Sequence, residues 1–61
     1  MKVRDLIALL EAQGWFQARQ KGSHRQFQHR SKKGTVTVSG KPNVHIPVGT
    51  YLSILKQAGL K

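Results

Sequence analysis

The chain has 61 residues, and 11 lysines and arginines against two acidic residues give it a formal net charge of +9. It contains no cysteine, which excludes a disulfide scaffold and a cysteine-based zinc site. Because each phosphate neutralised by a basic side chain releases counterions, a surplus of this size predicts a polyphosphate partner such as nucleic acid.

A chain of this length is predicted to form one domain over residues 1–61, since it can bury only one small core. Arg4, Asp5 and Glu11 interrupt the apolar N-terminal segment, so neither a signal peptide nor a membrane span is expected. We therefore predict a cytoplasmic protein. The three histidines lack the spacing of a metal motif, so no metal and no other cofactor is predicted.

The first predicted element is a helix over residues 3–13. Its apolar residues recur at helical spacing and form one stripe, Val3, Leu6, Ile7 and Leu10. Asp5 lies in the first turn, where the helix dipole favours an acid, and Gly14 is suited to end the helix in a left-handed conformation.

Two strands are predicted next, over residues 15–21 and 24–30. Gly22 and Ser23 between them are typical of a two-residue hairpin connection with a type II′ turn. If Lys21 pairs with His24, side-chain alternation divides the hairpin into two faces. One face is predicted to carry Phe16, Ala18 and Phe27, and the other to carry Gln17, Arg19, Lys21, His24, Gln26 and Gln28.

The alternating Thr-Val-Thr-Val of residues 35–38 predicts a third strand. With a four-residue loop over 31–34, Val38 is expected opposite Phe27, and Thr35 and Thr37 on the polar face. Pro47 is expected to open a second helix that runs to about Ala58 before Gly59 stops it, with the apolar stripe Val48, Leu52, Leu55 and Ala58.

These elements predict an α+β fold of order α-β-β-β-α, in which two helices cover one face of a three-stranded antiparallel sheet. The uncovered face is then polar and basic and is centred on His24, with Arg19 and Lys21 beside it. A histidine can take the proton of a ribose 2′-hydroxyl, and neighbouring cations can stabilise the charge on the attacked phosphate. The backbone amides of Gly22 and Ser23 can bind phosphate as well.

The segment Arg-Gln-Lys-Gly-Ser-His at 19–24, followed by Gln26-Phe27, resembles the signature of the HicA-type toxin family. Gly14-Trp15, the strand at 35–38 and the run from Ile54 to Leu60 are similar to that family too. The resemblance implies a bacterial ribonuclease that degrades messenger RNA and arrests growth. It also implies a fold like that of double-stranded-RNA-binding domains, a HicB-type antitoxin as partner, and a catalytic role for His24.

The chain departs from this family at Ser39-Gly40, where many members carry a proline and a histidine. The general acid for the leaving 5′-oxygen is therefore left open between His29, His45, and a water molecule or lysine, of which the last is favoured. Trp15 is predicted to cover an edge of the core, with base stacking as the alternative. Ser23 is not expected to be a nucleophile, because no acidic residue lies near it in the sequence.

Two other functions compete with a metal-independent ribonuclease. The first is a non-catalytic module that binds double-stranded RNA, since a fold alone does not settle a function. The second is a cationic membrane-active peptide, which would need one long basic amphipathic helix. The strands and the hairpin turn predicted in the middle of the chain argue against the second.

Overall fold

The computed structural model describes residues 1–60 and contains the predicted order of elements. The elements are α1 (Val3–Ala12), β1 (Trp15–Lys21), β2 (His24–His29), β3 (Val36–Ser39) and α2 (Val48–Gln57). The three strands form one antiparallel sheet in the order β1-β2-β3. The α+β fold class is thus confirmed, while Lys61, the last residue of the predicted domain, lies outside the described part.

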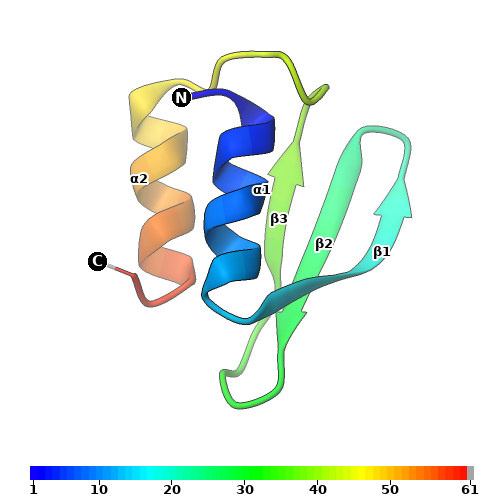
Figure 1. Cartoon of the computed structure of the whole chain (residues 1–61), viewed down its shortest axis with the longest axis vertical. Helices are drawn as coiled ribbons and strands as arrows, with labels where there is room; N and C mark the ends of the chain where they lie inside the picture. Colours follow the sequence, from blue (N-terminus) through cyan, green and yellow to red (C-terminus); the bar gives the residue numbers. More distant parts are fainter. Residues whose placement is uncertain (61) are drawn as a thin grey trace.

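The two helices lie side by side and cover the same face of the sheet (Figure 1). The core between the helices and the sheet contains residues from all five elements: Val3, Leu6, Leu10, Trp15, Phe27, Val36, Val38, Ile54, Leu55 and Ala58. The side chain of Phe27, in the central strand, is fully buried. Because β1 is exposed at every residue after Trp15, the β1–β2 hairpin extends beyond the cover of the helices.

The ends of α1 follow the sequence prediction closely. The Lys2 amide donates a hydrogen bond to the Asp5 carboxylate (3.0 Å), which satisfies one of the unpaired N–H groups at the start of the helix. At the other end, Gly14 has a φ of 93°, in the region that favours glycine. The chain can therefore turn directly from α1 into β1.

His29 fastens this turn to the far end of β2. Its Nε2 donates to the Gln13 carbonyl (3.0 Å), and its Nδ1 accepts from the Ser31 amide (3.1 Å). The second bond requires an unprotonated Nδ1, which assigns the ring proton to Nε2. The ring also meets Trp15 edge-on, with 5.2 Å between ring centroids. His29 is therefore a structural residue, which argues against its use as a general acid.

The packing at Gly14 gives a prediction about stability. A Cβ at this residue would lie 2.7 Å from His29 Nε2, whereas a Cβ at Gly34, which has nearly the same φ of 92°, would meet nothing within 4 Å. Each alanine should cost about 1–2 kcal/mol for its backbone conformation alone. Gly14→Ala should cost at least about 1 kcal/mol more, because the His29 bond to Gln13 must also be disturbed. Chemical denaturation of both variants measures this difference, and equal losses would contradict the role of His29.

The predicted hairpin register is correct only near the turn. Lys21 pairs with His24 and Arg19 with Gln26, but a β-bulge between Gln17 and Arg19 then shifts the pairing by one residue. Phe16, predicted to face the core, therefore lies on the outer face and is 45% exposed. The larger indole ring of Trp15 takes the buried place instead, and only 2% of this residue is exposed, which confirms its predicted role in the core.

The third strand and the second helix differ from prediction in detail. Val36, not Val38, lies opposite Phe27, so β3 is displaced by two residues and Thr35 falls outside the strand. In α2, Leu55 and Ala58 are buried as predicted, whereas Val48 is 72% exposed and Leu52 36% exposed. The face of α2 that packs against the core is rotated about the helix axis from the predicted stripe. It contains Tyr51, Ile54, Leu55 and Ala58.

Candidate nucleic-acid interface

The hairpin turn determines where the His24 side chain points. Gly22 has a φ of 58°, and the φ of Ser23 is not positive. A type II′ turn requires both of these conditions. The predicted turn is therefore present, with Lys21 and His24 as the paired residues that close it. Nothing lies within 4 Å of the Cβ position of Gly22, and within residues 1–60 neither turn amide forms a backbone hydrogen bond. A phosphate can therefore approach both amides.

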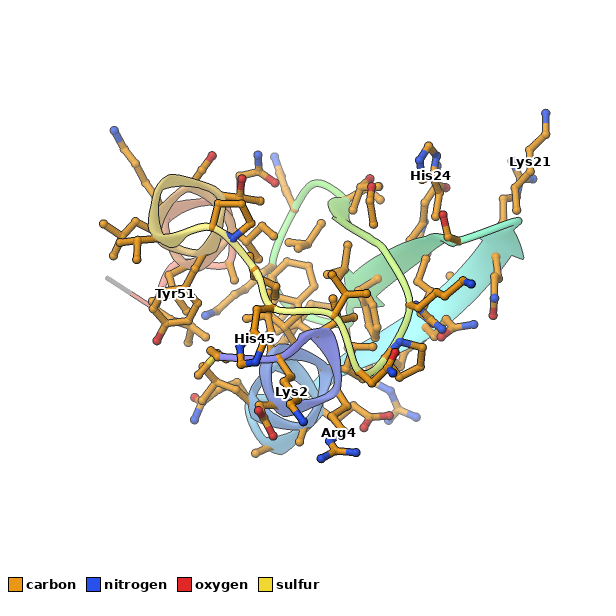
Figure 2. All side chains as sticks on the ribbon, turned by 90° about the horizontal axis from the view of Figure 1, so that it is seen from above. Lys2, Arg4, Lys21, His24, His45 and Tyr51 are labelled. Atoms are coloured by element: carbon orange, nitrogen blue, oxygen red, sulfur yellow. The ribbon has the colours of Figure 1, made fainter. Side chains whose placement is uncertain are left out.

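A row of three polar residues crosses the outer face of the sheet beside this turn. Lys21 of β1 pairs with His24 of β2, and His24 pairs with Ser39 of β3. Paired residues on one face have Cβ atoms about 5 Å apart, so a cation and a hydroxyl flank the imidazole. All three residues are exposed, and Figure 2 shows the Lys21 and His24 side chains pointing the same way, away from α1.

A second polar row lies next to the first. Arg19 pairs with Gln26, which pairs with Thr37, and alternation of side chains puts all three on the same face as His24. Arg19 is exposed, so its guanidinium is available to a ligand. Within residues 1–60, the outer face thus combines the exposed cations Arg19 and Lys21 with His24 and several hydrogen-bonding groups, which suits a polyanion.

Two hydrogen bonds attach Gly40, the residue after β3, to the β1–β2 hairpin, one to the turn and one to β2. The Gly40 amide donates to the Ser23 carbonyl (3.2 Å), and the Arg25 guanidinium donates to the Gly40 carbonyl (2.9 Å). Arg25 lies on the opposite face from His24 and is partly buried, so its charge supports the backbone rather than the outer face. These bonds hold Ser39 and the turn in a fixed relation to each other.

The structure separates the other two histidines from His24. Both ring nitrogens of His29 are engaged with the turn after α1 and with Ser31. The backbone of His45 pairs with Lys2, and its ring lies beside that residue over α1 (Figure 2). Neither ring is brought next to the His24 imidazole, so the outer face carries one histidine.

Two contributions to this region were not predicted from the sequence. Ser39 was noted only as a departure from a family pattern, yet it lies directly opposite His24 because β3 is displaced by two residues. Arg25 was not singled out, although its position one residue after His24 predicts a side chain on the inner face. Outside this region, the Lys32 ammonium donates to the Ala58 carbonyl (3.0 Å) and so caps the end of α2.

The arrangement suits proton transfer on a large, anionic substrate. Residues 1–60 enclose no pocket, and the outer face of the sheet is an open surface. In the same part of the chain, no three histidine or acidic side chains gather closely enough to hold a metal ion. The available chemistry is that of the exposed His24 imidazole between a lysine and a serine, beside two turn amides that form no backbone hydrogen bond within residues 1–60.

Comparison of the chain with known protein families shows which family it is similar to. The family model for the HicA toxin of bacterial toxin-antitoxin systems matches residues 3–60, nearly the whole chain. This match confirms the resemblance to the HicA-type toxin family. None of the curated proteins matches the chain. Within residues 1–60, the helices are too short or too polar to cross a membrane.

Proposed function

Because the chain belongs to the HicA toxin family of bacterial toxin–antitoxin systems, we propose that it is an endoribonuclease that cleaves messenger RNA with His24 as general base. The observation that carries this proposal is the row Lys21–His24–Ser39 on the open outer face. An imidazole suits proton transfer near neutral pH, and the neighbouring lysine suits a phosphate.

In the proposed reaction, His24 removes the proton of a ribose 2′-hydroxyl. The 2′-oxygen attacks the adjacent phosphorus, the bond from phosphorus to the 5′-oxygen breaks, and a 2′,3′-cyclic phosphate remains on one product. Lys21 and Arg19 stabilise the negative charge on the phosphoryl oxygens, and the amides of Gly22 and Ser23 donate hydrogen bonds to them. Water or a lysine supplies the proton to the leaving oxygen, since neither His29 nor His45 lies beside His24. The reaction needs no metal ion.

A toxin of this family works together with an antitoxin. We propose a HicB-type antitoxin that binds over the outer face in the bacterial cytoplasm and blocks access to His24. The exposed cations Arg19 and Lys21 favour an acidic or polar covering surface. Under this proposal the chain forms a single catalytic domain.

The main alternative is a module that binds double-stranded RNA without cutting it. The exposed basic sheet face would serve either function. The two differ in what happens to the RNA, because a binding module leaves the substrate intact under all conditions.

The role of the 2′-hydroxyl gives a direct test of the chemistry. The main cleavage site is first mapped on a labelled single-stranded RNA, and a single 2′-deoxynucleotide is then introduced on the 5′ side of the cleaved bond. Cleavage there should fall to background, because the attacking oxygen is absent, while cuts elsewhere in the same RNA continue at the parent rate. Cleavage of the deoxy substrate at the mapped bond would exclude the proposed mechanism.

A further inference from the structure

The exposed ring of Phe16 is a feature of the outer face that the proposed chemistry does not use. Phe16 pairs with Gln28, which is exposed, while its neighbour Trp15 is buried on the opposite face. Alternation therefore directs the Phe16 ring to the same face as His24. Without the β-bulge at Gln17, the ring would point toward the core, so the irregularity of β1 is what exposes it.

The position of this ring is unusual for an apolar side chain. Among residues 1–60, the exposed large apolar residues are Met1, Phe16, Val44, Val48 and Leu52. Phe16 is the one aromatic residue of this set and the one that lies in the sheet. Its neighbours on the outer face are Arg19 on the same strand and Gln28 across from it, so an apolar ring lies beside one cationic and one polar side chain.

A flat ring beside a cation matches the two chemical parts of a single-stranded nucleic acid. Cations bind the phosphates, and an exposed aromatic ring offers a face on which an unpaired base can stack. An apolar protein surface would gain little here, because the neighbouring Arg19 charge would have to be desolvated without a partner. We propose that Phe16 is a base-stacking subsite for the RNA that the toxin cleaves, an inference that rests on the proposed function.

The register indicates where along the RNA the stacked base lies. Gln28, the partner of Phe16, is four residues from His24 on β2, which corresponds to about 13 Å along the strand. The stacked base is therefore not the one at the cleaved bond but one farther along the same strand. Since a base must be unpaired to stack on the ring, the subsite selects single-stranded segments over duplex RNA.

The test uses proteins that carry His24→Ala, so that RNA stays intact while its binding is measured. The probe is a fluorescently labelled, unstructured RNA of 12 nucleotides. Phe16→Ala should weaken its affinity by about 5- to 100-fold, as expected for the loss of one stacked base. The dependence of affinity on salt concentration should stay the same, because no phosphate contact is lost. Phe16→Tyr should keep the parent affinity, whereas Phe16→Leu should not, since it is apolar without a ring.

Three comparisons make the result specific. Lys21→Ala should weaken binding and also lower the salt slope by about 1, as the loss of one phosphate contact requires. Val48→Ala, which removes an exposed apolar side chain from α2, should change neither quantity. A set of RNA probes, each with one abasic nucleotide at a different position, should contain one probe that lacks the stacked base. This probe should bind the protein that retains Phe16 weakly, and it should lose no further affinity when Phe16 is replaced by alanine.

The outcomes separate the subsite from the function as a whole. If Phe16→Ala binds RNA as tightly as the protein that retains Phe16, while Lys21→Ala binds more weakly, the stacking subsite is overturned. The exposed ring would then be assigned to the interface with the antitoxin. An effect of Phe16→Leu as small as that of Phe16→Tyr also overturns it, because apolar contact would then suffice. If none of the proteins binds RNA and the protein with His24 cuts none, the proposed function fails, and the subsite fails with it.

Discussion

Replacing His24 by alanine is expected to slow RNA cleavage by about 10²–10⁴-fold, the usual contribution of a positioned general base. The side chain is exposed and lies on the face away from the core, so its removal should leave the fold and the stability unchanged. The rate constant for cleavage of a labelled single-stranded RNA, measured under single-turnover conditions, gives the size of the effect.

His45→Ala is the matched control, because it removes a second exposed histidine whose backbone pairs with Lys2 at the start of α1. It should cleave RNA at the parent rate. A His24→Ala protein that is folded by circular dichroism and cleaves as fast as its parent would exclude His24 as the base. Loss of activity in both variants would instead indicate that the two histidines act together.

Phe27→Ala is expected to have the largest effect on stability. Its side chain is fully buried in the central strand, and removal of a buried phenylalanine ring costs about 3–5 kcal/mol. The total stability of a chain of this length is about 3–9 kcal/mol on the usual per-residue range. Phe27→Ala should therefore remove at least about one third of the free energy of unfolding, which urea denaturation followed by circular dichroism measures.

Replacing Phe16 by alanine tests whether the β-bulge is present. Phe16 is 45% exposed on the outer face, so Phe16→Ala should cost less than about 1 kcal/mol. If the hairpin had the regular register predicted from its turn, both phenylalanines would face the core and both variants would be strongly destabilised. Similar losses in the two variants would therefore show that the bulge is absent.

The sequence predicted those parts of the fold that depend on local chemistry. The type II′ turn follows from glycine at position 22, and the end of α1 follows from glycine at position 14, since both require a positive φ. The apolar stripe of α1 was also predicted correctly, because its polar residues leave one choice of buried face. In each case a few neighbouring residues determine the conformation.

The features that the sequence did not predict depend on contacts between distant segments. The bulge near Gln17 exchanges Phe16 for Trp15 in the core, and alternation alone cannot show which of two adjacent aromatic residues is buried. A displacement of β3 by two residues keeps the valines inside, so the Thr-Val pattern fits both registers equally well. In α2, Val48 and Leu52 are as apolar as Ile54, and packing against β3 decides which side is covered.

The candidate site contains residues that local sequence patterns predict and residues that only long-range pairing brings together. Turn chemistry and family resemblance together indicated His24, Lys21 and the turn amides, because these lie within four consecutive residues. Ser39 became a neighbour of His24 only through the true register of β3. Phe16 joined the outer face only through the bulge. Residues far apart in the chain thus enter the site through irregularities that no local pattern shows.

The most direct test of the account is incubation of the purified protein with a labelled single-stranded RNA in excess EDTA, followed by analysis of the new RNA ends. A metal-independent reaction that uses His24 should leave 2′,3′-cyclic phosphate and 5′-hydroxyl ends. RNA that stays intact in EDTA but is cut when Mg²⁺ is restored would contradict the proposed mechanism. RNA that is bound and never cut would assign the outer face to binding alone.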